Sequence, residues 1–197
     1  MKTLGPVLVG AIALGAFGGG SNGAADGRWA RSIVLQKRDL PAFKSEPPLM
    51  SRTCLPQHLD SQTAFARSQH FSSGSRSVTA RAWIFPEERH ARDGFRNLVA
   101  RDYARCLKGQ GVVGARILVT SQAPFGGVTT GDRGIRITVR VSQSELRFTV
   151  YVDIVFVRRG RALADAAFTS SDHPFGLAAE AAAVGRMSAR MQAPPKR

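Results

Sequence analysis

The amino-acid sequence predicts an α+β domain in which a mostly antiparallel β-sheet carries two main helices. Short segments with alternating apolar residues, typical of half-buried strands, recur from about residue 63 to residue 168. Two longer segments, residues 87–108 and a final one ending near Gln192, instead repeat apolar residues every three or four positions, as amphipathic helices do. With 43% hydrophobic residues among 197, the chain can bury a core, and one domain behind a leader is expected.

The first 25 residues are typical of a signal peptide. Lys2 supplies a short basic region, and Leu4 to Phe17 is an uncharged apolar stretch that is short for a bilayer span. The small residues at 23–25 then offer a cleavage site. The sequence therefore predicts export across a membrane, and an extracytoplasmic protein that is secreted or membrane-associated at the cell envelope.

Residues 14–17 are similar to a bacterial lipobox, but Phe17 occupies the place of the lipidated cysteine. This leaves open whether the leader is removed or anchors the chain. Beyond it we expect a linker over residues 26–34, a single domain over residues 35–192 and a tail over residues 193–197.

The expected elements follow in chain order. A helical turn before Pro41 comes first, and strands are then expected over residues 43–45, 63–68, 77–85 and 116–122. Pro86, followed by two glutamates, favours the start of the helix 87–108, which Gly109 ends. The two helices cover one face of the sheet or both.

Three further strands are expected to form a meander, and matching their apolar residues predicts its register. A two-residue turn at Gln143-Ser144 places Ile135 opposite Val152. A three-residue loop over residues 159–161 then places Phe156 opposite Ala164.

The alternative two-residue loop, Arg159-Gly160, is rejected because it would direct Asp165 into the core. The choice matters, since it decides which acidic side chains share a face of the sheet.

Cys54 and Cys106 are the two cysteines of the chain. An even number of cysteines in an exported protein favours a disulfide, which would pin the helix 87–108 to the segment around Cys54. Closing a loop of 53 residues would stabilise the fold by roughly 4 kcal/mol in the chain-entropy estimate. A metal pair is disfavoured because further cysteine ligands and zinc-site spacing are lacking.

Asp153 interrupts the apolar run 148–157. The register above places it on one face with Asp165, Arg136 and Arg140. Two acids beside two arginines are typical of an ion-pair network on a half-buried face, and an acid–base pair or metal site is the alternative.

The net charge of +14 would attract a polyanion such as a wall polymer or an anionic lipid surface. The basic residues are scattered, and no aromatic-plus-arginine cluster of the kind that stacks bases is found, so nucleic acid is not an expected partner.

The sequence does not support any known catalytic or cofactor-binding motif. Residues 109–114 match G-x-G-x-x-G, but a helix precedes them and a strand follows, the reverse of the dinucleotide-binding order. The four histidines lack the spacing of a metal site, and nucleophile-elbow and P-loop motifs are missing. We expect no cofactor and no metal.

The order of elements resembles small secreted or lipoprotein domains of actinobacteria, related in fold to the Mog1/PsbP-like group and to extracellular sensor-like domains. The resemblance covers about residues 35–192. It rests on segments 39–41, 87–108 with its cysteine, 151–161 and 168–175. It implies a sandwich-like α+β fold and a binding module, and it implies no catalytic residues for this chain.

The sequence thus predicts an exported, non-enzymatic binding module whose partner is a small hydrophobic ligand or an envelope protein, bound in a groove between a helix and the sheet. One alternative is a surface protein that binds an anionic polymer or lipid. A second is an enzyme that uses Asp153 and Asp165.

Overall fold

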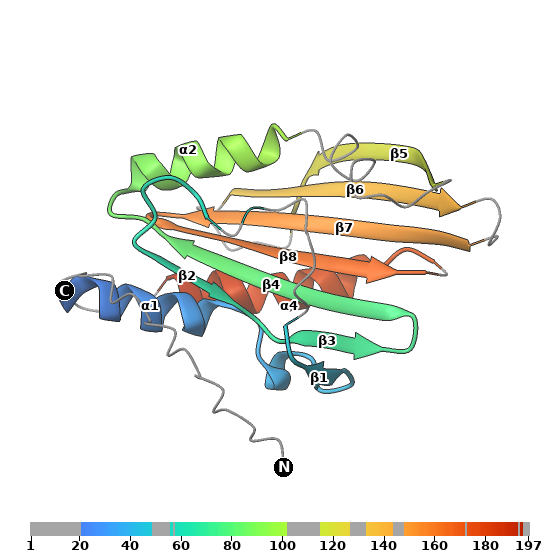
Figure 1. Cartoon of the computed structure of the whole chain (residues 1–197), viewed down its shortest axis with the longest axis horizontal. Helices are drawn as coiled ribbons and strands as arrows, with labels where there is room; N and C mark the ends of the chain where they lie inside the picture. The colour runs from blue at the N-terminus through green and yellow to red at the C-terminus, as the bar shows by residue number, and fades with distance from the viewer. Residues whose placement is uncertain are drawn as a thin grey trace, which may run out of the picture.

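An eight-stranded antiparallel sheet forms the centre of the computed structural model (Figure 1). The structure describes residues 21–48, 56, 58–101, 115–126, 133–143, 148–171, 173–192 and 194. The elements are α1 (Ser21–Ile33), the 3-10 turn η1 (Lys37–Asp39), β1 (Lys44–Glu46), β2 (Ala64–Arg67), β3 (His70–Ser73), β4 (Arg76–Ile84), α2 (Glu88–Val99), β5 (Ala115–Pro124), β6 (Arg133–Gln143), β7 (Phe148–Arg159), β8 (Ala162–Ser170) and α4 (Leu177–Met191). The predicted α+β class with a mostly antiparallel sheet is confirmed.

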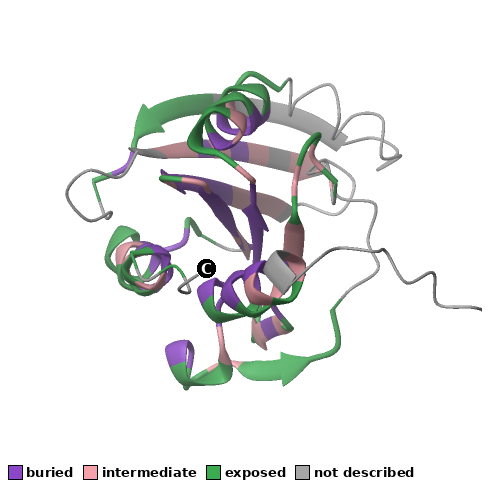
Figure 2. Cartoon of the chain, turned by 90° about the vertical axis from the view of Figure 1, so that its left-hand side faces the viewer, coloured by how far each residue is buried: buried purple, intermediate pink, exposed green. Residues whose placement is uncertain are grey.

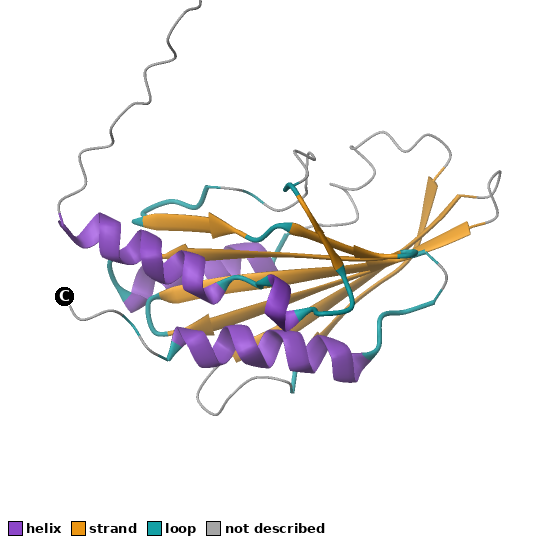
Figure 3. Cartoon of the chain, turned by 90° about the horizontal axis from the view of Figure 1, so that it is seen from below, coloured by secondary structure: helices purple, strands orange, loops and turns teal. Residues whose placement is uncertain are grey.

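Helices cover both faces of this sheet. α1 and α4 lie side by side on one face, and α2 lies on the other (Figures 2 and 3). Each face has its own apolar cluster: Ala82 and Phe168 belong to the α1–α4 side, whereas Trp83 and Phe156 belong to the α2 side. The central strands are therefore buried on both sides.

The strand order is β1-β3-β4-β8-β7-β6-β5, and β2 pairs with β4 on the same edge as β3. β2 and β3 are successive pieces of one broken strand. At the break, the Ser68 hydroxyl accepts a hydrogen bond from the Ala80 N–H at 2.8 Å, and the Ser68 N–H donates to the Ala80 carbonyl at 2.8 Å. This extra residue reverses the phase of the strand, so Phe65 faces the α2 side and Phe71 faces the α1–α4 side.

The predicted register of the meander is wrong at its first turn. Ile135 pairs with Phe156 rather than with Val152, a shift of four residues. Because side chains alternate with a period of two, an even shift keeps the same residues on the same face, and apolar matching cannot detect it.

The second turn of the meander is also corrected. Gly160 and Arg161 form a two-residue turn in which Gly160 has a φ of +49°, so Phe156 pairs with Asp165 and not with Ala164. Asp165 therefore lies on the Phe156 face, inside the α2-side core, which is the placement that the sequence prediction had rejected. An ion pair with Arg81 offsets the cost of burying this carboxylate.

The predicted linker over residues 26–34 is likewise wrong, because most of it lies in α1. Asp26, Trp29, Ala30 and Ile33 are buried and spaced three or four residues apart, which puts them on one face of this helix. Tertiary burial of this stripe outweighs the low helix propensity of the glycines in the segment.

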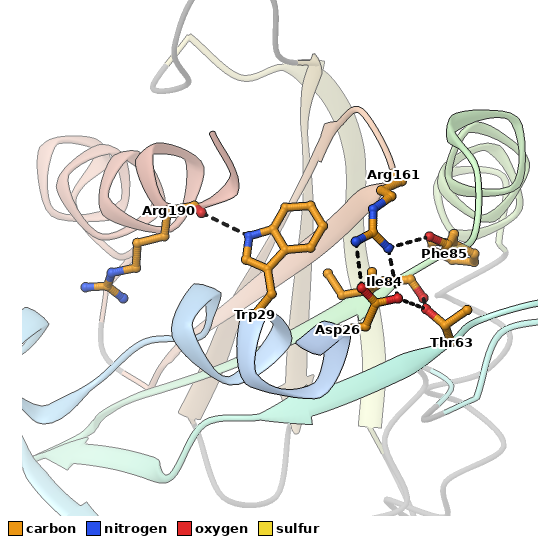
Figure 4. A network of polar contacts seen from close by, with 7 residues as sticks. All are labelled: Asp26, Trp29, Thr63, Ile84, Phe85, Arg161 and Arg190. Atoms are coloured by element: carbon orange, nitrogen blue, oxygen red, sulfur yellow. Dashed lines mark hydrogen bonds and ion pairs between the residues drawn. The ribbon is translucent and has the colours of Figure 1, made fainter. Parts of the chain in front are cut away.

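A polar network fastens α1 to the rest of the domain (Figure 4). Arg161 donates two hydrogen bonds to the Asp26 carboxylate, at 2.6 and 2.8 Å, and its guanidinium lies 4.9 Å from the centre of the Trp29 ring. Thr63 donates to Asp26 at 2.6 Å, and the Trp29 indole donates to the Arg190 carbonyl at 3.2 Å. α1 thus contacts β2, the β7–β8 turn and α4.

Several predictions concern residues outside the described part of the chain. They are the leader up to residue 20, the cysteines Cys54 and Cys106, residues 102–108 of the predicted helix, and most of the tail. Within the described part, that helix already ends at Val99, earlier than predicted. Among the described helices, none combines the length and hydrophobicity that a bilayer span requires.

Candidate functional site

A polar cleft of about 380 Å³ separates α2 from the turn that precedes β2. α2 lines it with residues at helical spacing, His90, Asp93, Asn97 and Arg101, the last lying just beyond the helix. The other wall is the segment 58–61. The cleft thus joins two segments that lie about thirty residues apart in the sequence.

The wall opposite α2 is a tight turn that its own hydrogen bonds close. Gln62 donates its N–H to the Leu59 carbonyl at 3.3 Å, and its side-chain oxygen accepts the Leu59 N–H at 3.0 Å. Ser61 occupies the third position of this turn with a φ of +63°, a conformation that favours glycine. Such backbone strain in a non-glycine residue is frequent at binding and catalytic sites.

The floor of the cleft depends on Gly94. A Cβ at this position would lie 3.1 Å from the ring of Phe85 and 3.6 Å from the Leu59 side chain. The missing side chain lets α2 lie close to both residues, which belong to the α2-side core. The cleft therefore has an apolar floor beneath polar walls.

The polar walls offer both signs of charge and both kinds of hydrogen-bonding group. Arg101 and Asn97 can donate, and Asp60 and Asp93 can accept. Asp93 also pairs with Arg96 at 2.5 Å on the exposed side of α2. His90 has a buried Nδ1 atom without a hydrogen-bond partner. Within the described residues, no three His, Cys, Asp or Glu side chains lie close enough together to hold a metal ion.

The polar cluster predicted from the sequence lies elsewhere and is divided by the sheet. Asp153 pairs with Thr138 and Phe168 on the α1–α4 side, whereas Asp165 lies on the α2 side. Both carboxylates are 1% exposed. Their predicted placement on one face is therefore wrong, and the two cannot act together on a substrate.

Asp153 takes part in a buried ion cluster beneath α4. Its Oδ2 atom lies 2.8 Å from the Arg136 guanidinium, and its Oδ1 atom accepts a hydrogen bond from Thr138 at 2.5 Å. Glu180 of α4 lies 3.1 Å from the same guanidinium. Burial first, and then the Asp153 charge, raise the pKa of Glu180 to about 7. Sequence reasoning missed Glu180, because its partners are more than twenty residues away.

Arg140 and Asp165 have separate partners. Arg140 lies over the Tyr151 ring, 5.0 Å from its centre, on the same sheet face as Arg136. Asp165 accepts two hydrogen bonds from Arg81 at 2.7 and 3.2 Å. Burial raises the pKa of Asp165 against the opposing effect of Arg81. Each of the two acids forms an ion pair, but the predicted network is wrong for Asp165, whose partner is Arg81 and not Arg136 or Arg140.

The cleft itself was missed by sequence reasoning. Its histidines were considered singly and set aside for lack of mutual spacing, and Ser61 carried no signal. The helical spacing of His90, Asp93, Asn97 and Arg101 was visible in the sequence, as a polar stripe beside the apolar one. What faces it could be known only from the fold.

Comparisons with known proteins show no family for this chain. No family model matches it, and no curated protein matches it. Among solved structures, the extracellular domain of PknH from Mycobacterium tuberculosis aligns with a TM-score of 0.46 and 11% identity, over 84% of this chain and 95% of that one. PA94 from Pseudomonas aeruginosa, a protein of unknown function, aligns with a TM-score of 0.29 and 12% identity, over 65% and 82%. The Mog1/PsbP-like fold is not confirmed by these similarities, which are too low to carry an argument about function.

Proposed function

We propose that this protein is an extracytoplasmic binding module that holds a small polar ligand in the cleft between α2 and the segment 58–61. One observation carries the proposal. Polar side chains from two separate segments converge on a cleft of about 380 Å³ with an apolar floor. That combination, together with the strained Ser61, is typical of ligand sites.

The chemistry of the walls favours a ligand with hydroxyl or charged groups, such as a sugar or an amino acid. The described lining residues include both donors and acceptors, and no Phe, Tyr or Trp is among them. This ligand is more polar than the hydrophobic one expected from the sequence.

We further propose binding without turnover. The carboxylates that suggested catalysis, Asp153 and Asp165, are committed to arginines on opposite faces of the sheet. Among the described lining residues, Ser61 makes no hydrogen bond to a histidine, whereas an activated nucleophile is hydrogen-bonded to its base.

The test is ligand-observed NMR and thermal unfolding with a panel of monosaccharides, sugar phosphates and amino acids. A ligand present at a hundred times its Kd should stabilise the fold by about 2.7 kcal/mol and raise the melting temperature. NMR of the same samples over time would report any chemical conversion of the ligand.

Paired variants of α2 make the test specific. Arg101→Leu removes a charge from the cleft just beyond the end of α2, and Arg92→Leu removes one from α2 outside the cleft. We expect Arg101→Leu, and not Arg92→Leu, to abolish the saturation-transfer signal and the thermal shift. Equal effects of both variants, or no response to any of the three ligand classes, would refute the proposed site.

A further inference from the structure

The helix layer formed by α1, η1 and α4 has no exposed acidic residue. Its three acids are Asp26, Asp39 and Glu180, which are 4%, 5% and 0% exposed. Each forms an ion pair with a half-buried arginine: Asp26 with Arg161, Asp39 with Arg190 and Glu180 with Arg136. The layer therefore contributes no negative charge to the surface.

The same layer exposes five basic side chains. These are Arg28, Arg31, Lys37, Arg38 and Arg186. None of them forms an ion pair with an acid of the described part of the chain. Lys37 and Arg186 donate instead to backbone carbonyls of the neighbouring segment, which fixes their positions without an ion pair. We call these five residues the basic face.

The same layer also exposes apolar surface. Leu177, at the start of α4, is 60% exposed and is the large hydrophobic residue that the described structure leaves most open to solvent. A shallow groove of about 200 Å³, which Leu177 does not line, lies between the segment 39–43 and the alanines of α4, with Arg186 among its lining residues. Contacts between Arg186 and Asp39, and between Trp29 and α4, hold α1, η1 and α4 together as one layer.

We infer that the basic face docks onto a bilayer surface of anionic phospholipid. Exposed apolar surface together with Arg and Lys that lack acidic partners is typical of proteins that rest in the headgroup region of such a membrane. The position of the leader points the same way. The apolar stretch 4–17 ends only three residues before α1 begins at Ser21, so a membrane that holds this stretch adjoins α1.

This docking leaves the candidate cleft free. α2 lies on the sheet face opposite α1 and α4, so a molecule resting on its basic face would turn the cleft away from the bilayer (Figures 2 and 3). The inference does not depend on the proposed ligand, because it uses a separate surface and a separate chemistry.

The experiment measures co-sedimentation of the full chain with vesicles of phosphatidylcholine, with and without phosphatidylglycerol. Each basic residue at an anionic surface strengthens binding by about fivefold, so Arg28→Gln with Arg31→Gln should weaken partitioning by roughly 25-fold. Binding by the wild type should also fall steeply between about 0.1 M and 1 M NaCl, as the screening length drops from about 10 Å to about 3 Å.

The matched control removes the same number of charges from the opposite layer, as Arg92→Gln with Arg96→Gln. These arginines already pair with Glu88 and Asp93, and we expect the control to bind like the wild type. Binding that ignores phosphatidylglycerol, salt and both variants would assign attachment to the apolar leader alone and overturn the inference. It would also be overturned if the basic-face variant kept its vesicle binding but lost binding to a teichoic-type polymer or to DNA.

Discussion

The two helix layers of this protein handle charge in opposite ways. On the α2 side, the acids Glu87, Glu88 and Asp93 are exposed and pair with neighbouring arginines in the same surface segment. In the layer of α1, η1 and α4, each of the three acids is buried and pairs with an arginine of another element: the β7–β8 turn for Asp26, α4 for Asp39 and β6 for Glu180.

The difference shows how one set of buried ion pairs can both stabilise the fold and determine the charge of the surface. Burying the acids of the α1–α4 layer fastens its helices to the sheet, and it also strips the outer surface of negative charge. The basic residues that remain there are unopposed. On the α2 layer, pairing at the surface leaves a nearly balanced exterior beside a polar cleft.

The largest effect is expected on the free energy of unfolding, when a buried ion pair of the α1–α4 layer is disrupted. Asp26→Ala leaves the half-buried Arg161 without its carboxylate, and removing one partner of a buried ion pair costs about 3–5 kcal/mol. Asp93→Ala removes one partner of an exposed pair, which costs about 1 kcal/mol or less. The measurement is urea unfolding of both variants beside the wild type.

Trp29→Ala provides a second probe of the same anchor, because the indole is 5% exposed and contacts both Arg161 and α4. Its loss should cost about 3–5 kcal/mol. If Asp26→Ala and Trp29→Ala unfold at the wild-type urea concentration, then α1 is not part of the cooperative domain, and the contrast between the layers fails.

The second expected effect is a dependence of stability on pH that differs in sign between the layers. Burial raises the pKa of Glu180 to about 7, from 4.5. The folded state therefore binds a proton that the unfolded state releases, so stability falls as the pH rises from about 4.5 to about 7 and then levels off. The full effect is about 3 kcal/mol for this shift, and Glu180→Gln should recover much of it at pH 8.

Glu88 on the α2 layer supplies the opposite case. Its hydrogen bond and ion pair with Arg158 lower its pKa, so its contribution is present at neutral pH and is lost as the pH falls below its usual range. Urea unfolding at pH 5 and pH 8 separates the two. Glu180→Gln should gain stability relative to the wild type only at the higher pH, whereas Glu88→Gln should lose stability at both values, because both lie above the usual pKa range of Glu88. A gain for Glu180→Gln that is equal at both values would contradict the assigned titration.

Sequence reasoning predicted the sheet well and its charged residues poorly, for physical reasons. Alternation marks a strand and its two faces, and β4 was found almost residue for residue. Alternation does not fix register, since any even shift preserves the faces, and the pairing of Ile135 was missed by four positions. Asp165 could be placed in the core only by knowing that Arg81, 84 positions away, would meet it there.

α1 was missed for the opposite reason, because the residue spacing that indicates this helix is present in the sequence. Asp26, Trp29, Ala30 and Ile33 have helical spacing, but glycines and an adjacent leader favoured a linker. A buried acid on the same stripe as Trp29 makes sense only once Arg161 is in place. The candidate cleft was hidden in the same way, since each of its walls is an ordinary polar segment by itself.

The smallest expected effect lies in the cleft and tests whether its strain has a use. Ser61 holds a φ of +63°, which costs a non-glycine residue about 1 kcal/mol, so Ser61→Gly should stabilise the fold by somewhat less than about 1 kcal/mol after the added freedom of the unfolded chain. Gly74→Ser, at a φ of +58° in the β3–β4 turn, should destabilise it by a similar amount. If the strained turn positions the cleft, Ser61→Gly will also weaken binding of any polar ligand found by NMR, whereas Gly74→Ser will leave that binding unchanged. If Ser61→Gly is more stable and binds the ligand with unaltered affinity, the strain at Ser61 has no role in binding. If its affinity is weaker, the strained turn contributes to the binding site.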